Sequence, residues 1–164
     1  MLNLTKKTDY GLIALKHLAV NRGRGSASAK EIADAYRIPL PLLSKVLQKL
    51  AKNGFLQSAH GTNGGYKLAR DPKYISALEV IRTIDGPIIL THCFTEHGEC
   101  QQSEKCTVRE PLRKVHEGIL RLLASITIAD MSKDEPEDRS DREARGKTQE
   151  SGQRLPVLEA FWGN

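Results

Sequence analysis

The hydrophobic pattern of the first 70 residues is helical in three successive segments and then changes to two short strand-like runs. Helices are predicted from about Thr5 to Arg22, from Ser28 to Tyr36 and from Pro41 to Asn53. Two strands are predicted at 55–58 and 66–70, with a glycine-rich tip between them. Two helices joined by a tight turn and followed by a β-hairpin form a winged helix-turn-helix.

One face of each predicted helix carries the residues that we expect in the core, which must be mostly aliphatic because aromatic residues make up only 5% of the chain. These residues are Tyr10, Ile13, Ala14, His17 and Leu18 in the first helix, Ile32, Ala33 and Tyr36 in the second, and Leu43, Val46, Leu47 and Leu50 in the third. A Ser-x-x-Glu capping box is predicted at Ser28–Glu31 and again at Ser76–Glu79, where it opens a fourth helix. Its inward residues are Ala77, Val80, Ile81 and Ile84.

Positive charge is concentrated in this winged-helix part of the sequence. Residues 1–70 carry 12 Lys and Arg and 3 Asp and Glu, whereas the whole chain has a net charge of +5. A compact basic half favours a polyanion as partner, and a winged helix-turn-helix binds nucleic acid. The alternative interpretation of the same charge is a solvated basic face.

Double-stranded DNA would meet the chain at the third helix and at the wing. The start of the third helix enters the major groove in such folds, so Ser44 and Lys45 are the candidates for reading base edges. Lys49 and Lys52 lie further along and are expected to reach phosphates. The full set of DNA-binding candidates is Pro41, Leu42, Ser44, Lys45, Lys49, Lys52, His60 and Thr62.

Several classes of protein are disfavoured. No stretch approaches the roughly 18 uninterrupted apolar residues of a membrane span, and the N-terminus lacks the apolar run of a secretory signal. We therefore expect a cytoplasmic protein with no membrane partner, in which three cysteines do not form a disulfide framework. No nucleophile–base arrangement or glycine-rich nucleotide-binding motif stands out, so an enzyme is not expected.

All three cysteines of the chain, Cys93, Cys100 and Cys106, fall within one polar segment with the spacing Cys-x6-Cys-x5-Cys. Structural cysteines usually stand singly among apolar neighbours, whereas these are surrounded by Glu, His, Gln, Ser and Lys. Thiolates select soft metals, which points to zinc or an iron–sulfur cluster. The close cysteine pairs common in zinc sites are absent, and the wide spacing suits a cluster. Three free thiols are the alternative.

The apolar positions after Cys106 repeat with a heptad-like period, which predicts a long helix of about five turns. Its narrow apolar stripe either packs onto the chain's own domain or pairs two copies. Pairing is favoured, because the winged-helix part is too small to cover so long a stripe and paired half-sites on DNA require paired proteins. The residues expected at the homodimer interface are Leu112, Val115, Ile119, Leu122 and Ile126.

The fold class predicted from these patterns is mainly α with a small β-hairpin wing: a winged helix-turn-helix plus a long C-terminal dimerisation helix. Residues 1–75 would form the DNA-binding domain, and residues 76–131 the cluster-binding loop and dimerisation helix. Residues 132–164 are rich in charge and poor in large apolar side chains, which predicts a disordered tail.

Three stretches carry a family likeness: Leu-Thr-Lys-Lys-Thr-Asp-Tyr-Gly-Leu at 4–12, Gly-Pro-Ile-Ile-Leu-Thr at 86–91 and Ile-Thr-Ile-Ala-Asp-Met at 126–131. With the wing sequence at 61–66, they resemble the IscR/NsrR-type winged-helix iron–sulfur regulators of bacteria, and among these the regulators of SUF iron–sulfur assembly genes. The likeness covers about 1–131. It implies a homodimer that binds palindromic promoter DNA, with a 2Fe–2S or 4Fe–4S cluster that tunes the affinity.

The same resemblance implies a fourth ligand beside the three cysteines. Some members use a histidine three residues after the last cysteine, where this chain has Arg109, which does not ligate iron. Other members use an acidic residue near the start of the first helix, donated by the partner subunit, and Asp9 occupies that place. Asp9 as a plain first-turn acid is the alternative, and His92 and His97 are the rival ligands. In the wing, His60 replaces the family's usual arginine.

The function expected on these grounds is a homodimeric transcriptional regulator whose promoter affinity is set by an iron–sulfur cluster and which controls SUF genes. One alternative is a repressor of the same fold that senses nitric oxide or redox changes through zinc or free thiols. Another, from a different class, is a cysteine-based redox carrier, which would leave the basic first half of the chain unexplained.

Overall fold

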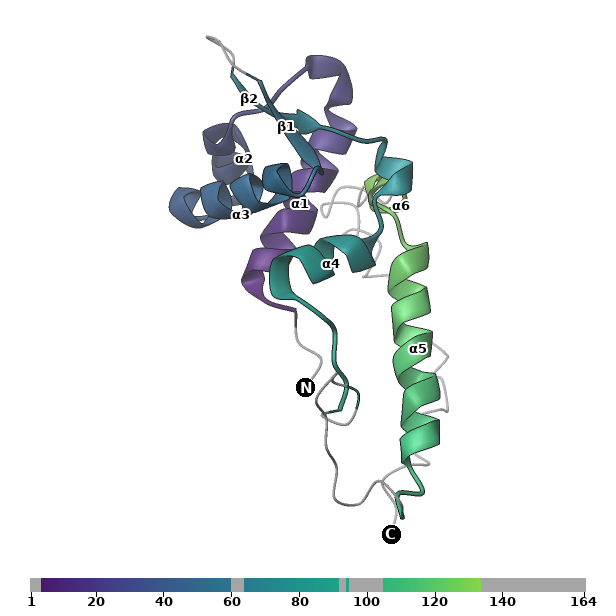
Figure 1. Cartoon of the computed structure of the whole chain (residues 1–164). Coiled ribbons are helices and arrows are strands. Elements are labelled where there is room, and N and C mark those ends of the chain that lie inside the picture. Colours follow the sequence, from purple (N-terminus) through teal and green to yellow (C-terminus); the bar gives the residue numbers. More distant parts are fainter. Residues whose placement is uncertain (1–3, 60–63, 92–93, 95–104, 134–164) are drawn as a thin grey trace, which may run out of the picture. The chain divides into compact units, whose positions relative to one another are not determined.

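A computed structural model describes residues 4–59, 64–91, 94 and 105–133. Within these residues, ten helices and strands follow one another along the chain. They are α1 (Lys6–Val20), η1 (Arg22–Arg24), α2 (Ala29–Tyr36), α3 (Leu40–Lys52), β1 (Leu56–Ala59), β2 (Gly65–Leu68), η2 (Pro72–Tyr74), α4 (Ala77–Asp85), α5 (Arg109–Ser125) and α6 (Ile128–Lys133). Figure 1 shows α2, α3 and the hairpin beside α1, with α4 packed against α1 and α3. The predicted mainly helical fold with a two-stranded wing is confirmed.

Local sequence signals set the ends of these helices. The Ser28 side chain accepts a hydrogen bond from the Glu31 N–H (3.1 Å) at the start of α2. Ser76 and Glu79 form the complete predicted capping box, because the Glu79 carboxylate also accepts from the Ser76 N–H at 3.1 Å. Gly54 follows α3 with φ of +77°, a left-handed conformation that favours glycine after a helix.

The core confirms the predicted inward faces of α3 and α4. Leu43, Val46, Leu47 and Leu50 are each at most 4% exposed, and the inward residues of α4 are also buried. The aliphatic side chains of α3 and α4 therefore lie in the core, and the polar side of α3 faces outward.

The prediction for α1 was wrong in part. Its buried residues are Thr8, Gly11, Ala14, Leu15 and Leu18, whereas Tyr10, Ile13 and His17 are only half-buried. The reason is that α1 packs against α3, α4 and α6, so its buried stripe, which includes Thr8, Gly11 and Leu15, is turned about the helix axis from the predicted one. Tyr36, predicted to face inward, is 43% exposed, and its ring packs edge-on against His17.

The wing is fixed against the start of α2. Strands β1 and β2 pair antiparallel with Leu56 opposite Leu68, and β2 also forms a bridge to Ala27. In that bridge the Tyr66 N–H donates to the Ala27 carbonyl at 2.8 Å, and the Ala27 N–H donates to the Tyr66 carbonyl at 3.0 Å. A side chain at Gly65 would collide with the Ala27 backbone, so glycine is required for this close approach.

After α5 the chain returns to the core, which the sequence analysis did not foresee. Ile126 lies just past α5 in extended backbone, and its carbonyl accepts a hydrogen bond from the Ala77 N–H at 2.8 Å. Thr127 and Asp130 cap α6 reciprocally, with the Thr127 hydroxyl donating to the Asp130 carboxylate at 2.7 Å. Ile128 then fills a fully buried position.

Candidate functional site

The start of α3 presents the residues predicted to read base edges. Pro41 and Lys45 are exposed, and Leu42 and Ser44 are half-buried. They share the outer side of the helix because Leu43, Val46 and Leu47 face the core. Lys52 is also exposed, at the last turn of α3. Among the described residues, no hydrogen bond or ion pair engages the ammonium groups of Lys45 and Lys52, so both are available to an anionic partner.

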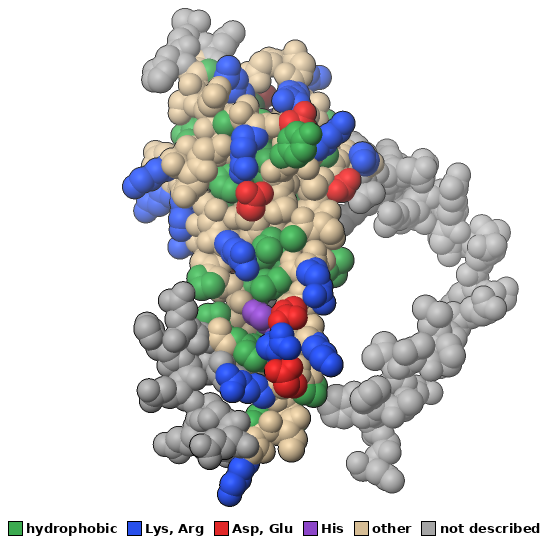
Figure 2. All heavy atoms as spheres, turned by 45° about the vertical axis from the view of Figure 1, so that its right-hand side comes forward, with side chains coloured by type: hydrophobic (Ala, Val, Ile, Leu, Met, Phe, Trp, Pro, Cys, Tyr) green, Lys and Arg blue, Asp and Glu red, His purple; other side chains and the backbone are tan. Residues whose placement is uncertain are grey.

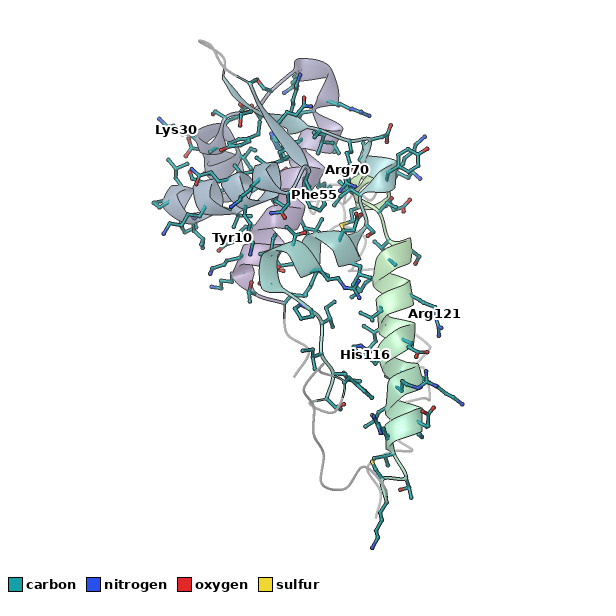
Figure 3. The ribbon with its side chains drawn as sticks, viewed as in Figure 1. Tyr10, Lys30, Phe55, Arg70, His116 and Arg121 are labelled. Carbon is teal, nitrogen blue, oxygen red and sulfur yellow. The ribbon has the colours of Figure 1, made fainter. Side chains whose placement is uncertain are left out.

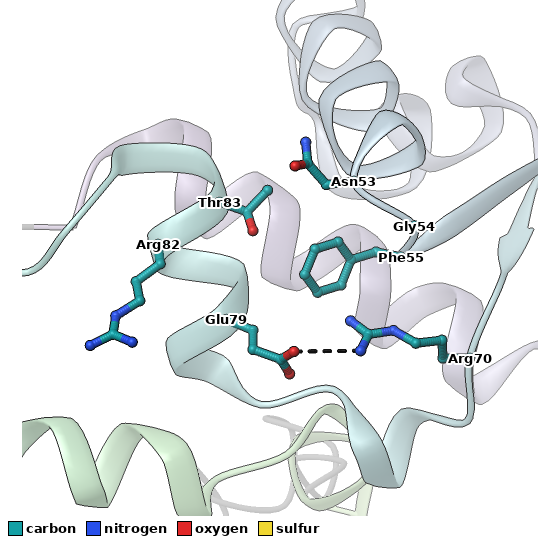
Figure 4. Close-up of a pocket in the computed structure, with 7 residues that line it drawn as sticks. All are labelled: Asn53, Gly54, Phe55, Arg70, Glu79, Arg82 and Thr83. Atoms are coloured by element: carbon teal, nitrogen blue, oxygen red, sulfur yellow. Dashed lines mark hydrogen bonds and ion pairs between the residues drawn. The ribbon is translucent and has the colours of Figure 1, made fainter.

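The base of the wing is anchored to α4 by Arg70. Its guanidinium carbon lies 4.7 Å from the centre of the Phe55 ring, and its Nη1 lies 3.4 Å from Glu79 Oε1 (Figure 4). A hollow of about 550 Å³ opens around these groups, lined by Asn53, Gly54, Phe55, Arg70, Glu79, Arg82 and Thr83. Arg70 is already paired with a carboxylate and an aromatic ring, and its contacts orient the wing. The predicted wing contacts His60 and Thr62 lie outside the described residues.

Lys49, predicted as a phosphate contact, is engaged within the protein. Its Nζ donates a hydrogen bond to the backbone carbonyl of Ile84 at 3.0 Å. Ile84 lies in the last turn of α4, where carbonyls lack helical partners and the helix dipole is negative. The ammonium therefore joins α3 to the C-terminal end of α4.

Asp85, the next residue, joins the same end of α4 to the start of α1. Its carboxylate accepts hydrogen bonds from the Thr5 N–H (3.1 Å), the Thr5 hydroxyl (2.6 Å) and the Thr8 hydroxyl (2.7 Å). Partial burial acts to raise the pKa of Asp85, but the hydrogen bonds from Thr5 and Thr8 outweigh it and hold that pKa below its ordinary value. The ionised carboxylate thus caps α1 at the positive end of its dipole.

The cysteine segment connects α4 to α5. Cys106 is a free, half-buried thiol shortly before α5, whereas Cys93 and Cys100 lie outside the described residues. Phe94 packs on His116 of α5 with ring centres 5.3 Å apart. His116 and Arg121 project from different sides of α5 (Figure 3). The segment therefore meets α5 near the middle of the helix as well as at its start.

The donors present fit an iron–sulfur cluster in their chemistry. Asp9 is exposed in the first turn of α1, and no hydrogen bond or ion pair among the described residues occupies its carboxylate. Within the described ranges, no three His, Cys, Asp or Glu side chains gather at one point. His92 and His97 lie outside these ranges. His116 was missed by the sequence analysis: its Nδ1 is buried without a partner among the described residues.

The long helix α5 has an apolar stripe that the chain's described residues leave open. Val108, Val115 and Leu122, each seven residues apart, are 56%, 51% and 60% exposed. Leu112 and Ile119, on the same stripe, are half-buried. Figure 2 shows hydrophobic side chains along this helix, flanked by charged ones. None of the helices in the described ranges, α5 included, is long and apolar enough to cross a membrane.

Comparison with known proteins agrees with the winged-helix fold and with a DNA-binding regulator. Residues 4–134 match the model of the Rrf2 family, described as an iron-dependent transcriptional regulator. The transcriptional regulator NsrR of Geobacillus kaustophilus is 35% identical over 140 residues, which cover 85% of this chain and 95% of the relative. IscR of Xenorhabdus nematophila is 30% identical over 158 residues, covering 92% and 96%.

Solved structures of regulators also share this fold. CymR, the global cysteine regulator of B. subtilis, superposes with a TM-score of 0.71 at 29% identity and covers 81% of this chain and 98% of its own. IscR of T. potens gives a TM-score of 0.63 at 28% identity, covering 92% and 94%. The winged helix, the basic third helix and the match over 4–134 together show that this chain belongs to the Rrf2 family and is a DNA-binding transcriptional regulator.

Proposed function

We propose that the protein is a homodimeric cytoplasmic regulator whose affinity for promoter DNA is set by an iron–sulfur cluster, and that it controls genes of SUF-type cluster assembly. The observation that carries this proposal is the position of the cysteine segment. It begins after α4, whose last residues are hydrogen-bonded to α1 and α3, and it ends at Cys106 before α5. A change in the segment therefore acts next to the helices that hold the DNA-reading helix.

The ligands would come from two regions of the sequence. Cys93, Cys100 and Cys106 would supply three thiolates, and Asp9 of the opposite subunit would supply the fourth ligand, since its carboxylate is exposed and unengaged among the described residues. The cluster would bring redox-sensitive iron–thiolate bonds to the segment. The chain's own residues then determine how the segment is tied to α1, α3 and α4.

The division of roles follows the sequence. Residues 1–75 would bind DNA, 76–131 would carry the ligands and the dimer helix, and 132–164 would form a disordered tail. At the DNA, the start of α3 would meet base edges while Lys52 meets phosphate and the wing tip meets an adjacent groove. The residues proposed at base edges and in the wing are Pro41, Leu42, Ser44, Lys45, His60 and Thr62.

The test is the visible absorption of protein purified without oxygen, combined with iron and sulfide quantification and Mössbauer spectroscopy. We expect a coloured protein, and we expect Cys93→Ala, Cys100→Ala and Cys106→Ala each to remove the colour while far-ultraviolet circular dichroism stays unchanged. Ser103→Ala, a change within the same segment, is the matched control and should stay coloured. A fully coloured Cys100→Ala protein would exclude Cys100 as a ligand.

The fourth ligand has its own test. Asp9→Ala should shorten the lifetime of the chromophore in air or shift its spectrum, because a carboxylate ligand is lost. If the spectrum, lifetime and DNA affinity all match those of the parent, the ligand lies elsewhere. His116, with its buried unpartnered Nδ1, then joins His92 and His97 as the next variants to make.

A second candidate function uses the same fold without a cluster: a repressor that senses nitric oxide or oxidants through zinc or free thiols. The observation that favours it is the free, half-buried thiol of Cys106. Colourless protein with stoichiometric zinc, or with three titratable thiols and no metal, would support this candidate over the first. A redox carrier lacks support, because the relatives are named as transcriptional regulators.

A further inference from the structure

Three helices meet at the C-terminal end of α4. The contacts are the hydrogen bond from Lys49 to the Ile84 carbonyl and the three that Asp85 accepts from Thr5 and Thr8. We call this group of five residues the three-helix junction. It joins α3, which carries the DNA-reading residues, to α1 and α4 through groups that are far apart in the sequence.

Close packing holds the helices together beside these hydrogen bonds. A Cβ atom at Gly11 of α1 would collide with Ile84 Cδ1 and would lie 3.4 Å from Val46 Cγ1 of α3. The side chains of Ile84 and Val46 therefore fill the space beside Gly11, and a larger residue there would require Ile84 to shift. A displacement of the last turn of α4 must be accommodated by α1 or α3, because close-packed interiors transmit strain.

Lys49 differs from the other lysines of α3 in the contacts of its ammonium group. All three lysines are exposed, but Lys45 and Lys52 make no hydrogen bond or ion pair among the described residues. The Lys49 ammonium instead donates to the Ile84 carbonyl at the negative end of the α4 dipole, and its charge contributes to lowering the pKa of Asp85. To reach a phosphate it would have to leave that carbonyl.

From these contacts we infer that Lys49 is a positioning residue rather than a phosphate contact: it holds the last turn of α4 on α3 and so sets the orientation in which α3 meets DNA. The chain passes through Gly86, at φ of +90°, directly from the junction into the segment that leads to the cysteines. The junction therefore couples that segment to α3. This inference rests on the proposed function as a DNA-binding regulator.

The experiment compares Lys49→Met with Lys52→Met, since methionine keeps the apolar stem and removes the charge. Each full-length protein is titrated, over a range of salt concentrations, with a duplex selected from a random pool by the parent protein and with its scrambled version. A phosphate contact predicts a slope of log affinity against log salt that is reduced by about one, equally on both duplexes. We expect that result for Lys52→Met.

For Lys49→Met we expect an unchanged salt slope, an affinity for the selected duplex lowered by about tenfold, and little change on the scrambled duplex. Hydrogen exchange should also show faster exchange of the amides at the end of α4. Asp85→Asn should produce the same pattern, and the double variant should lose less than the two single losses multiplied together.

Two outcomes would overturn the positioning role: a slope reduced by about one in Lys49→Met with unchanged exchange at the end of α4, or fully multiplicative effects of the two variants. A different result would count against the proposed function itself. If the parent bound the pool without selecting any sequence, specific promoter binding would be refuted whatever Lys49 does.

Discussion

Lys45 is the first exposed cation within α3, the helix proposed to read DNA, and its donors match a guanine edge. We predict that Lys45→Ala costs about 1–3 kcal/mol of binding free energy on the selected duplex and little on a scrambled one. Titration of both labelled duplexes at two salt concentrations measures the difference. Lys52→Ala, later on the same helix, is the matched control and should weaken both duplexes alike.

Equal weakening of both duplexes by Lys45→Ala would make Lys45 a phosphate contact. Specificity would then rest with Ser44, Leu42 or the wing tip.

Asp85 makes the stability of the fold depend on pH. Partial burial opposes its ionisation, but the hydrogen bonds from Thr5 and Thr8 lower the pKa in the folded protein, whereas an unfolded chain keeps the ordinary value of about 4. The unfolded state therefore binds the proton more tightly. The stabilisation is complete above the unfolded pKa and is lost as the pH falls through the folded pKa.

Asp85→Asn should therefore flatten the acid limb of the stability curve, because the asparagine does not titrate. Urea unfolding between about pH 3 and about pH 6 should show a steeper fall for the parent than for the variant. Asp34→Asn, which changes an exposed carboxylate of α2, serves as the control. Identical slopes in parent and Asp85→Asn would show that the junction does not supply this pH dependence.

The wing depends on one close contact between two elements. The backbone of β2 at Gly65 lies so near Ala27 that an added methyl group has no space. Gly65→Ala should lower the free energy of unfolding by about 1–3 kcal/mol and displace the hairpin from α2. Chemical denaturation measures the loss, and DNA affinity should fall with it. Gly23→Ala is the control, because nothing lies within 4 Å of its added atom, and a loss as large there would remove the argument from packing.

The inward faces of α3 and α4 could be predicted from sequence, whereas the inward face of α1 was predicted only in part. α3 and α4 have one apolar face each, and every residue that their periodicity predicted to face inward is buried. The buried stripe of α1, which includes Thr8, Gly11 and Leu15, is turned from the predicted one because α1 packs against α3, α4 and α6. α6 was missed although Thr127-x-x-Asp130 is a capping pattern that would have indicated its start.

The candidate site was predictable only where its residues are neighbours in sequence. The three cysteines and the exposed residues of α3 share short segments, so spacing and charge indicated them. The contact from Lys49 to Ile84 spans 35 positions, and that from Thr8 to Asp85 spans 77. Such pairings arise from the tertiary packing of α1, α3 and α4, which no local pattern encodes.

At the scale of the whole molecule, the described residues leave one large apolar surface open, the stripe of α5. A protein of this size rarely leaves a row of large apolar side chains in water, and the stripe here repeats every seven residues at Val108, Val115 and Leu122. The period suits a second copy of the same helix. We therefore place the proposed homodimer contact here, with Leu112, Val115, Ile119, Leu122 and Ile126 as its residues.

Charge introduced on this stripe should separate the two subunits, since a buried carboxylate without a partner is strongly unfavourable. We predict that Val115→Glu combined with Leu122→Glu yields a species with the 18.2 kDa mass of one chain, measured by light scattering, while helical content is retained. Arg121→Ser, on a different side of α5, should leave the parent's mass unchanged. Because two tethered half-site readers gain about 10²–10⁴ in effective affinity, the monomer should lose a comparable factor on a palindromic duplex and little on a single half-site. A double variant that keeps the mass of two chains would show that the stripe does not hold the subunits together.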